Sequence, residues 1–160
     1  MIKSFMVIYF RKAVIVKALI QRVKRASVSI DNELYSSIKS GILVFLGVEK
    51  CDNYENADWL AEKIVKLRIF EDENGKMNQS IADVNGEILV VSQFTLCGNC
   101  MKGTRPSFDN AMEPQKANEL YEYFTRKFQN FNISSKTGVF GAMMDIELIN
   151  DGPVTFMIEK

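Results

Sequence analysis

Gly41-Ile-Leu-Val-Phe-Leu-Gly-Val48 is the stretch of the sequence that decides the fold. It is a short, uninterrupted apolar run that contains two glycines, and its length suits a strand better than a helix. A strand that is apolar at nearly every position is typically buried on both of its faces. The run therefore predicts the central strand of a sheet.

Further strands are predicted on both sides of this run. Residues 18–30 are extended as far as a turn at Asp31-Asn32. Residues 88–91 form a second fully apolar run, which again indicates a buried strand. The remaining predicted strands are 68–70, a segment after Ile133, and 154–158, the last preceded by a turn at Asp151-Gly152-Pro153.

Two amphipathic helices are expected between the strands. Asp52 and Glu55 have the spacing of a capping box, in which two side chains bond the free amides of a helix start. Pro114 suits the first turn of a second helix, where an amide hydrogen is not needed. Apolar residues follow each start at helical spacing and predict core packing: Trp59, Leu60, Ile64, Val65 and Leu67, then Ala117, Leu120, Tyr121, Phe124 and Phe128.

These elements predict a single α+β domain. Strands outnumber helices, so we expect a mostly antiparallel β-sheet or partial barrel with two packed amphipathic helices. A chain of 160 residues, 47% of them hydrophobic, is long enough for one domain with its own core. We assign the domain to residues 16–160 and treat residues 1–15 as an N-terminal extension.

The composition excludes several classes of catalyst. The absence of histidine removes Ser-His-Asp and Cys-His triads and the usual catalytic zinc sites. We therefore expect neither a metal nor an organic cofactor. Basic and acidic residues number 20 each, so the formal net charge is zero. A contact with nucleic acid should then be local rather than spread over a basic surface.

The cysteines are Cys51, Cys97 and Cys100. Their odd number and the lack of a convincing secretion signal favour reduced thiols in a cytoplasmic protein. Cys97 and Cys100 form a lone CxxC, which is found in redox motifs and zinc sites, but neither a second pair nor a histidine completes a ligand set. We interpret the pair as incidental to a turn, and a thiol oxidoreductase as an alternative.

Two motifs indicate a function: Ser92-Gln-Phe-Thr-Leu96 and Asn150-Asp-Gly-Pro-Val-Thr155. Together with segments such as Arg105-Pro-Ser-Phe108 and Phe140-Gly-Ala142, the chain from about Lys17 to its end resembles the D-aminoacyl-tRNA deacylases. The resemblance implies a homodimeric hydrolase that releases D-amino acids from tRNA, and glycine from mischarged tRNA(Ala), while it rejects L-aminoacyl-tRNA. We expect the acceptor end as partner, and neither a membrane nor DNA.

The resemblance places the catalytic residues at Ser92, Gln93, Phe94 and Thr95. Backbone N–H groups near Phe94 and Thr95 would stabilise the oxyanion formed from the ester carbonyl. A threonine nucleophile needs a base, so we favour water activated by the 2′-hydroxyl of the terminal adenosine. From this segment alone, an edge strand with exposed polar residues is the competing interpretation.

Gly152 and Pro153 resemble the family's Gly-cisPro element, which selects chirality. The element enters the pocket of the partner subunit, where its carbonyls hold the substrate amino group and its backbone clashes with an L side chain. Without the resemblance, the pair would be read as a simple turn, because few X-Pro bonds are cis.

Five residues are candidate contacts of the acceptor end. Lys102, Arg105 and Arg22 are candidates for phosphate, with surface solvation as the alternative. Phe140 and Met144 are candidates for packing on the terminal adenine, with core packing as the alternative.

The sequence departs from the family pattern at two places. Met143 stands where an aspartate is usual, which puts in doubt any role of an acid there, and Asn99 stands where an aspartate is common. Family members also begin close to the segment at Lys17, and Val16 stands where an initiator methionine is expected. We therefore predict that the working protein begins at residue 16. A non-catalytic RNA-binding module on the same fold is the alternative function.

Overall fold

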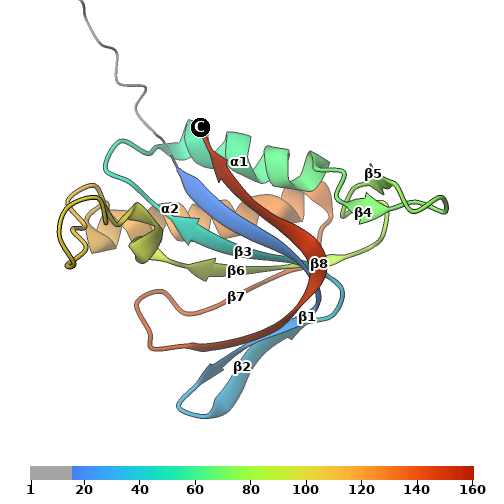
Figure 1. Cartoon of the computed structure of the whole chain (residues 1–160), viewed down its shortest axis with the longest axis horizontal. Coiled ribbons are helices and arrows are strands. Elements are labelled where there is room, and N and C mark those ends of the chain that lie inside the picture. Colours follow the sequence, from blue (N-terminus) through green and yellow to red (C-terminus); the bar gives the residue numbers. More distant parts are fainter. Residues whose placement is uncertain (1–15) are drawn as a thin grey trace, which may run out of the picture.

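The apolar run around Val44 forms β3 (Gly41–Gly47), the centre of the sheet in the computed structural model, which describes residues 16–160. β1 (Lys17–Ile30) pairs antiparallel with one side of β3, and β6 (Glu87–Ser92) pairs parallel with the other (Figure 1). Every residue of β3 except Phe45 is buried. This confirms the prediction of a central strand.

The length of β1 shapes the sheet. Its first half pairs with β3, its second half with β2 (Glu33–Ile38), and β8 (Asp145–Glu159) runs along its other side. The sheet consequently curls into a partial barrel beneath its centre (Figure 1). Asp31 and Asn32 form the predicted turn between β1 and β2, and both have positive φ, as a tight hairpin requires.

The centre of the sheet is parallel, which the sequence did not predict. β7 (Ser135–Thr137) pairs parallel with β6, so the order is β2-β1-β3-β6-β7 with β8 beside β1. Antiparallel pairs are still in the majority. The strand expected at 68–70 is reduced to β4 (Phe70–Glu71), which pairs with β5 (Met77–Gln79) in a separate small sheet.

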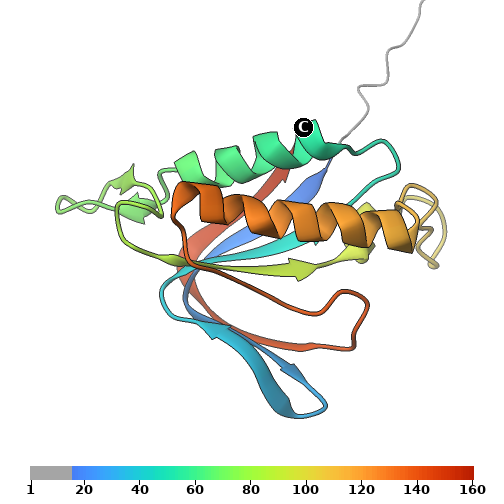
Figure 2. The same ribbon diagram turned by 180° about the vertical axis from the view of Figure 1, so that it is seen from behind.

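Two helices cover one face of the sheet. α1 (Tyr54–Lys66) lies in the connection from β3 to β6, and α2 (Pro114–Lys127) in the connection from β6 to β7. Both connections step in the same direction along the sheet, so the usual right-handed crossover puts both helices on the same face. Figure 2 shows them side by side over that face. No helix within residues 16–160 is long and apolar enough to cross a membrane.

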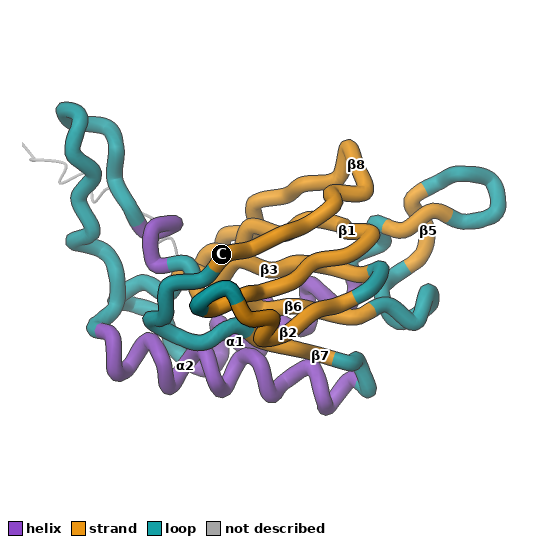
Figure 3. Tube along the Cα trace, turned by 90° about the horizontal axis from the view of Figure 1, so that it is seen from below, coloured by secondary structure: helices purple, strands orange, loops and turns teal. Residues whose placement is uncertain are grey.

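The protein has two apolar layers. The first lies between the helices and the sheet, and the predicted stripe of α2 and η2 (Phe128–Phe131) is buried there, with Phe124 and Phe128 fully inaccessible. Burying one such side chain contributes about 1.5–3 kcal/mol. Figure 3 shows both helices on one side of the strands. The second layer lies on the opposite face of the sheet: Val23, Ala26, Val28, Ile38, Leu43, Leu89 and Val91.

The predicted cap of α1 is wrong by one residue. Asn53 is the N-cap, and its side chain and that of Asn56 bond each other's backbone amides. Asp52 is buried instead, and its carboxylate accepts from the amides of Val16 at 2.5 Å and Glu49 at 2.6 Å. Asp52 therefore ties the start of β1 to the loop after β3 instead of capping the helix.

The predicted turn at Asp151-Gly152-Pro153 is also wrong, because β8 continues through it. Gln21 pairs with Thr155 and Val23 with Asn150, so residues 151–154 of β8 lie opposite Arg22 alone. The extra residues bulge out of the ladder, and the Gly152-Pro153 peptide bond is cis. The chain does not reverse there because both halves of β8 pair with β1.

Candidate functional site

Residues 92–96, the strand-end motif, leave the sheet where β6 ends. β6 ends at Ser92, the amide of Gln93 still donates to Leu46 O at 2.7 Å, and η1 (Phe94–Cys97) follows. Phe94 and Thr95 are exposed, and within residues 16–160 their amides donate to no acceptor of the chain. The Gln93 side-chain amide donates to the Thr95 hydroxyl. The motif thus presents two free N–H donors and an oriented hydroxyl to solvent.

The segment with Phe140 and Met144 lies beside the same end of β6. The amide of Gly138 donates to Val90 O at 2.9 Å, and Met144 Sδ accepts from the amide of Val139 at 3.4 Å. Phe140 packs on the first apolar layer, with its ring 5.8 Å from that of Tyr121. Both predicted adenine contacts are half-buried there. Met143 is 90% exposed.

Lys102 and Arg105 lie in the loop that follows η1. This loop is exposed from residue 99 to residue 110, and a bridge between Asn99 and Ser107 closes its base. Neither cation has an ion-pair partner in the part of the chain that the structure describes. Asn99 Oδ1 accepts from the amide of Met101 at 2.9 Å, so it keeps the acceptor that an aspartate would supply.

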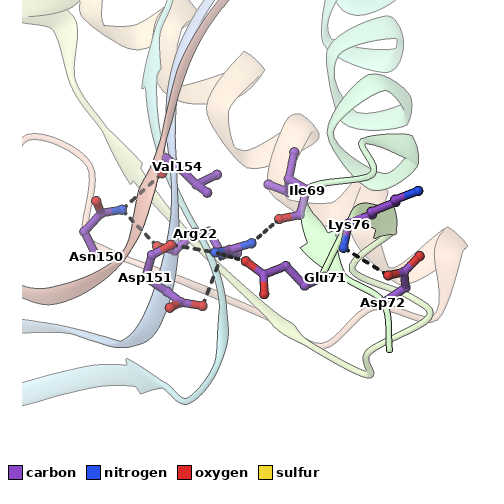
Figure 4. Close-up of polar contacts among 8 residues, drawn as sticks. All are labelled: Arg22, Ile69, Glu71, Asp72, Lys76, Asn150, Asp151 and Val154. Atoms are coloured by element: carbon purple, nitrogen blue, oxygen red, sulfur yellow. Dashed lines mark hydrogen bonds and ion pairs between the residues drawn. The ribbon is translucent and has the colours of Figure 1, made fainter. Parts of the chain in front are cut away.

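Arg22 is in a different environment. Its side chain is buried and points at the bulge of β8 and at the start of β4 (Figure 4). The guanidinium donates to Ile69 O at 2.6 Å and to Asp151 O at 2.9 Å, and it pairs with the carboxylates of Asp151 at 3.1 Å and Glu71 at 3.6 Å. The donors of Arg22 thus face groups of the chain itself.

Asn150 fixes the other side of the bulge, and sequence reasoning gave it no role of its own. Its side-chain amide donates to Arg22 O at 3.0 Å and to Val154 O at 3.1 Å, so it bridges the two ends of the bulge (Figure 4). A Cβ on Gly152 would lie 2.7 Å from Asn150 Oδ1. In the sequence, only its position as the first residue of the motif at 150–155 pointed to Asn150. The cis bond of Gly152-Pro153 is therefore held between an arginine and an asparagine.

The bulge and the strand-end motif lie far apart within one chain. The bulge faces Arg22, which pairs with Ile42, whereas Ser92 pairs with Leu46. Four residues along β3 span about 13 Å, and the three strand spacings from β8 to β6 add about 14 Å across the sheet. The separation is therefore about 20 Å. Residues 92–95 lie at the same end of β6 as the segment with Phe140 and Met144, and the loop with Lys102 and Arg105 follows them in the chain. Gly152 and Pro153 lie elsewhere on the sheet.

Cys97 and Cys100 do not form a redox centre in this structure. Cys97 is buried, its thiol donates to Val48 O at 3.4 Å, and Cys100 is exposed. Burial raises the pKa of the Cys97 thiol to about 11, with the neighbouring Glu49 acting in the same direction. A reactive thiol needs the opposite shift. Within residues 16–160, the structure contains no cluster of three side chains suited to a metal ion.

Comparison with known proteins identifies the family. The family model described as D-Tyr-tRNA(Tyr) deacylase matches residues 19–159. The chain belongs to this family. A D-aminoacyl-tRNA deacylase of Geotalea daltonii is 59% identical over 143 residues, which are 89% of this chain and 95% of the relative. A D-aminoacyl-tRNA deacylase of Thermosipho africanus is 52% identical over 90% of this chain and 97% of its own.

Two solved structures share the fold of this chain. One named c-Myc DNA Unwinding Element Binding Protein has a TM-score of 0.85 and 41% identity, and covers 90% of this chain and 98% of its own. A probable eukaryotic D-amino acid tRNA deacylase has a TM-score of 0.77 over 91% of this chain and 99% of its own, but only 16% identity. The second likeness, at this low identity, shows a shared fold.

Proposed function

We propose that the protein hydrolyses the ester bond of D-aminoacyl-tRNA in the cytoplasm, releasing the free amino acid and tRNA. The observation that carries this proposal is the pair of free amides of Phe94 and Thr95 at an exposed strand end, in a chain that belongs to the deacylase family. Two backbone donors at one point suit the oxyanion that forms when an ester carbonyl is attacked.

The chemistry follows from this placement and from the absence of histidine. Water adds to the ester carbonyl and gives a proton to the 2′-hydroxyl of the terminal adenosine. The 2′-hydroxyl passes its own proton to the leaving ribose oxygen as the bond between that oxygen and the carbonyl carbon breaks, so the products are the free amino acid and tRNA. The negative charge on the carbonyl oxygen is stabilised by the amides of Phe94 and Thr95. The Thr95 hydroxyl, held by Gln93, and Ser92 position the substrate and do not attack it.

Chiral selection is assigned to Gly152 and Pro153 of a partner subunit. The separation of about 20 Å within one chain leaves these residues unable to reach their own strand-end motif, so a homodimer with crossed sites is the arrangement we propose. The rigid carbonyls of the bulge hold the substrate ammonium group, and its backbone excludes an L side chain. Glycine, which has no side chain, is not excluded, so glycyl-tRNA(Ala) is also a substrate.

The acceptor end lies along the edge that carries η1. Lys102 and Arg105, exposed and without ion pairs among the described residues, bind phosphates. Phe140 and Met144 pack on the terminal adenine. Arg22 is buried, so we now assign it to holding the Gly152-Pro153 bulge in place of the phosphate contact that the sequence suggested.

The test of the activity is the release of amino acid from D-tyrosyl-tRNA and from L-tyrosyl-tRNA. We expect rapid release from the D substrate and none above the uncatalysed rate from the L substrate. Replacing Gly152 with alanine should reduce activity or discrimination between D and L substrates more than replacing Thr95 with alanine. The reason is that the backbone of the bulge, and not the Thr95 side chain, is proposed to exclude L side chains. Loss of turnover in Thr95→Ala, with folding and tRNA binding intact, would instead support a side-chain nucleophile.

The crossed site can be tested by complementation between subunits. Gly152→Val blocks the bulge, and Thr95→Pro removes one oxyanion donor. If each site uses residues of both chains, a mixed dimer of the two inactive variants contains one intact site and regains about half the activity of a wild-type dimer. Sedimentation should show a dimer at micromolar concentration. A fully active monomer, or mixed dimers without activity, would contradict the arrangement.

A nucleic-acid-binding module without catalysis is the second candidate. The 41% identical structure named for binding a DNA unwinding element is the observation that favours it. Such a module would bind tRNA or single-stranded DNA and release neither D- nor L-tyrosine, so the same assay separates the two functions.

A further inference from the structure

An exposed pair of aromatic rings, Phe94 and Phe108, lies at the candidate site, next to Thr95. Phe94 is 59% exposed and Phe108 is 38% exposed, although both side chains are large and apolar. Their ring centroids are 5.0 Å apart and the planes are tilted by 58°. The family resemblance gave no role to the Phe108 side chain, and only the backbone of Phe94 takes part in the proposed chemistry.

The local backbone is built to bring these rings together. The two backbone bonds between Asn99 and Ser107 close the loop at its base and return the chain to η1. Gly98 leaves room for the returning ring, since a Cβ there would lie 3.0 Å from Phe108 Cε1 and 2.9 Å from Thr95 O. The ring of Phe108 therefore rests on the backbone of Gly98 beside Phe94.

We propose that Phe94 and Phe108 form a stacking platform for an unpaired nucleobase, that of the nucleotide preceding the terminal adenosine of the substrate. The inference rests on the proposed function, which puts the ester at Thr95, the residue that directly follows Phe94. The terminal adenine is assigned to the segment with Phe140. The preceding nucleotide then leaves the site along the loop that carries the aromatic pair.

The chemistry of the loop favours RNA over other occupants. Lys102 and Arg105 lie on the loop that presents Phe108, and both are exposed. Exposed aromatic rings next to free cations are the usual combination for single-stranded nucleic acid, in which bases stack and phosphates pair. Stacking tolerates any base, which suits an enzyme that acts on many tRNAs.

The experiment compares two substrates with the variant Phe108→Leu. Leucine keeps an apolar side chain over Gly98 but removes the ring. We expect kcat/KM for D-tyrosyl-tRNA to fall about tenfold to a hundredfold, the usual loss for one stacked base. Hydrolysis of D-tyrosyl-adenosine, which lacks the preceding nucleotide, should be unchanged. The control is Tyr54→Leu, which removes a 53% exposed ring that also packs on another ring, Tyr123, but on the helical face.

A second arm leaves the protein intact. D-tyrosyl-tRNA with an abasic nucleotide before the terminal adenosine should lose as much activity with the wild-type enzyme as Phe108→Leu loses with the normal substrate. The two changes together should lose no more than either alone. Equal loss on D-tyrosyl-adenosine, or normal hydrolysis of the abasic substrate, would overturn the platform. Failure of the wild-type enzyme to hydrolyse normal D-tyrosyl-tRNA would instead overturn the proposed function.

Discussion

Replacing Arg22 with methionine tests what holds the Gly152-Pro153 bulge. Methionine keeps most of the apolar stem of the side chain but removes the guanidinium, which bonds Asp151 O on the bulge and Ile69 O before β4 (Figure 4). No other side chain in residues 16–160 bonds either carbonyl. The variant should therefore lose stability and also loosen the bulge.

The magnitude follows from the contacts. Two hydrogen bonds from a buried charge contribute about 1.5–3 kcal/mol each. The carboxylates of Glu71 and Asp151 are 56% and 38% exposed, so they rehydrate when the guanidinium is gone and add less than about 1 kcal/mol. We expect a loss of about 3–6 kcal/mol in the free energy of unfolding, or about 10–20 °C in Tm for a domain of this size.

The assay is urea unfolding together with kcat/KM for D-tyrosyl-tRNA at a temperature where the variant is folded. A displacement of the bulge by about 1 Å should lower kcat/KM by about a hundredfold. Arg25→Met is the matched control, because that arginine is three residues away on β1. Its only ion pair among residues 16–160, with Glu147, is exposed on both sides. If Arg22→Met behaves like Arg25→Met in both measurements, the bulge is held by something else and our reasoning is refuted.

Three further predictions concern the buried carboxylate, metals and the start of the chain. Burial raises the pKa of Asp52 from 3.8 to about 6 despite the amides of Glu49 and Val16, so the native state binds more protons than the unfolded state in that window. The free energy of unfolding should therefore fall by about 2 kcal/mol as the pH rises from 4 to 6, and this fall should vanish in Asp52→Asn. Urea titrations at each pH check this, and an unchanged slope in the variant would disprove it. Exhaustive chelation should leave deacylation unaffected, because the sequence offers no histidine for a catalytic metal, and activity that is lost and then restored by zinc would show otherwise. A chain that starts at residue 16 should keep its activity and its Tm, since the nitrogen of Val16 lies 2.5 Å from Asp52 Oδ1 and an α-amino group would keep that contact; intact mass of the natural protein decides where it begins.

Local pattern was sufficient for several elements of this protein. The all-apolar run of β3, the turn at Asp31-Asn32 and the stripe of α2 each depend on periodicity or turn chemistry within a few residues. The strand-end motif could also be identified from the sequence, because its residues are consecutive and their resemblance to the deacylases does not depend on a structure. For the same reason, the candidate contacts Lys102 and Arg105 could be named in advance, because they follow the motif within ten residues.

Only the tertiary structure showed the features that depend on contacts between residues far apart in the sequence. Asp52 has the chemistry of a helix cap, but Val16 and Glu49 take its carboxylate and Asn53 caps the helix instead. The segment at Gly152 looks like a turn, but pairing of both halves of β8 with β1 turns it into a bulge.

The same limit applies to the candidate site. Arg22 reads as a surface cation until the fold surrounds it with carbonyls 47 and 129 residues away in the chain. Phe108 reads as a loop residue until the loop closes and places its ring on Phe94. Short-range periodicity specifies which face of an element is apolar, whereas long-range pairing alone specifies which groups meet. The main helices and the central strand could therefore be predicted from the sequence, and the contacts that shape the site could not.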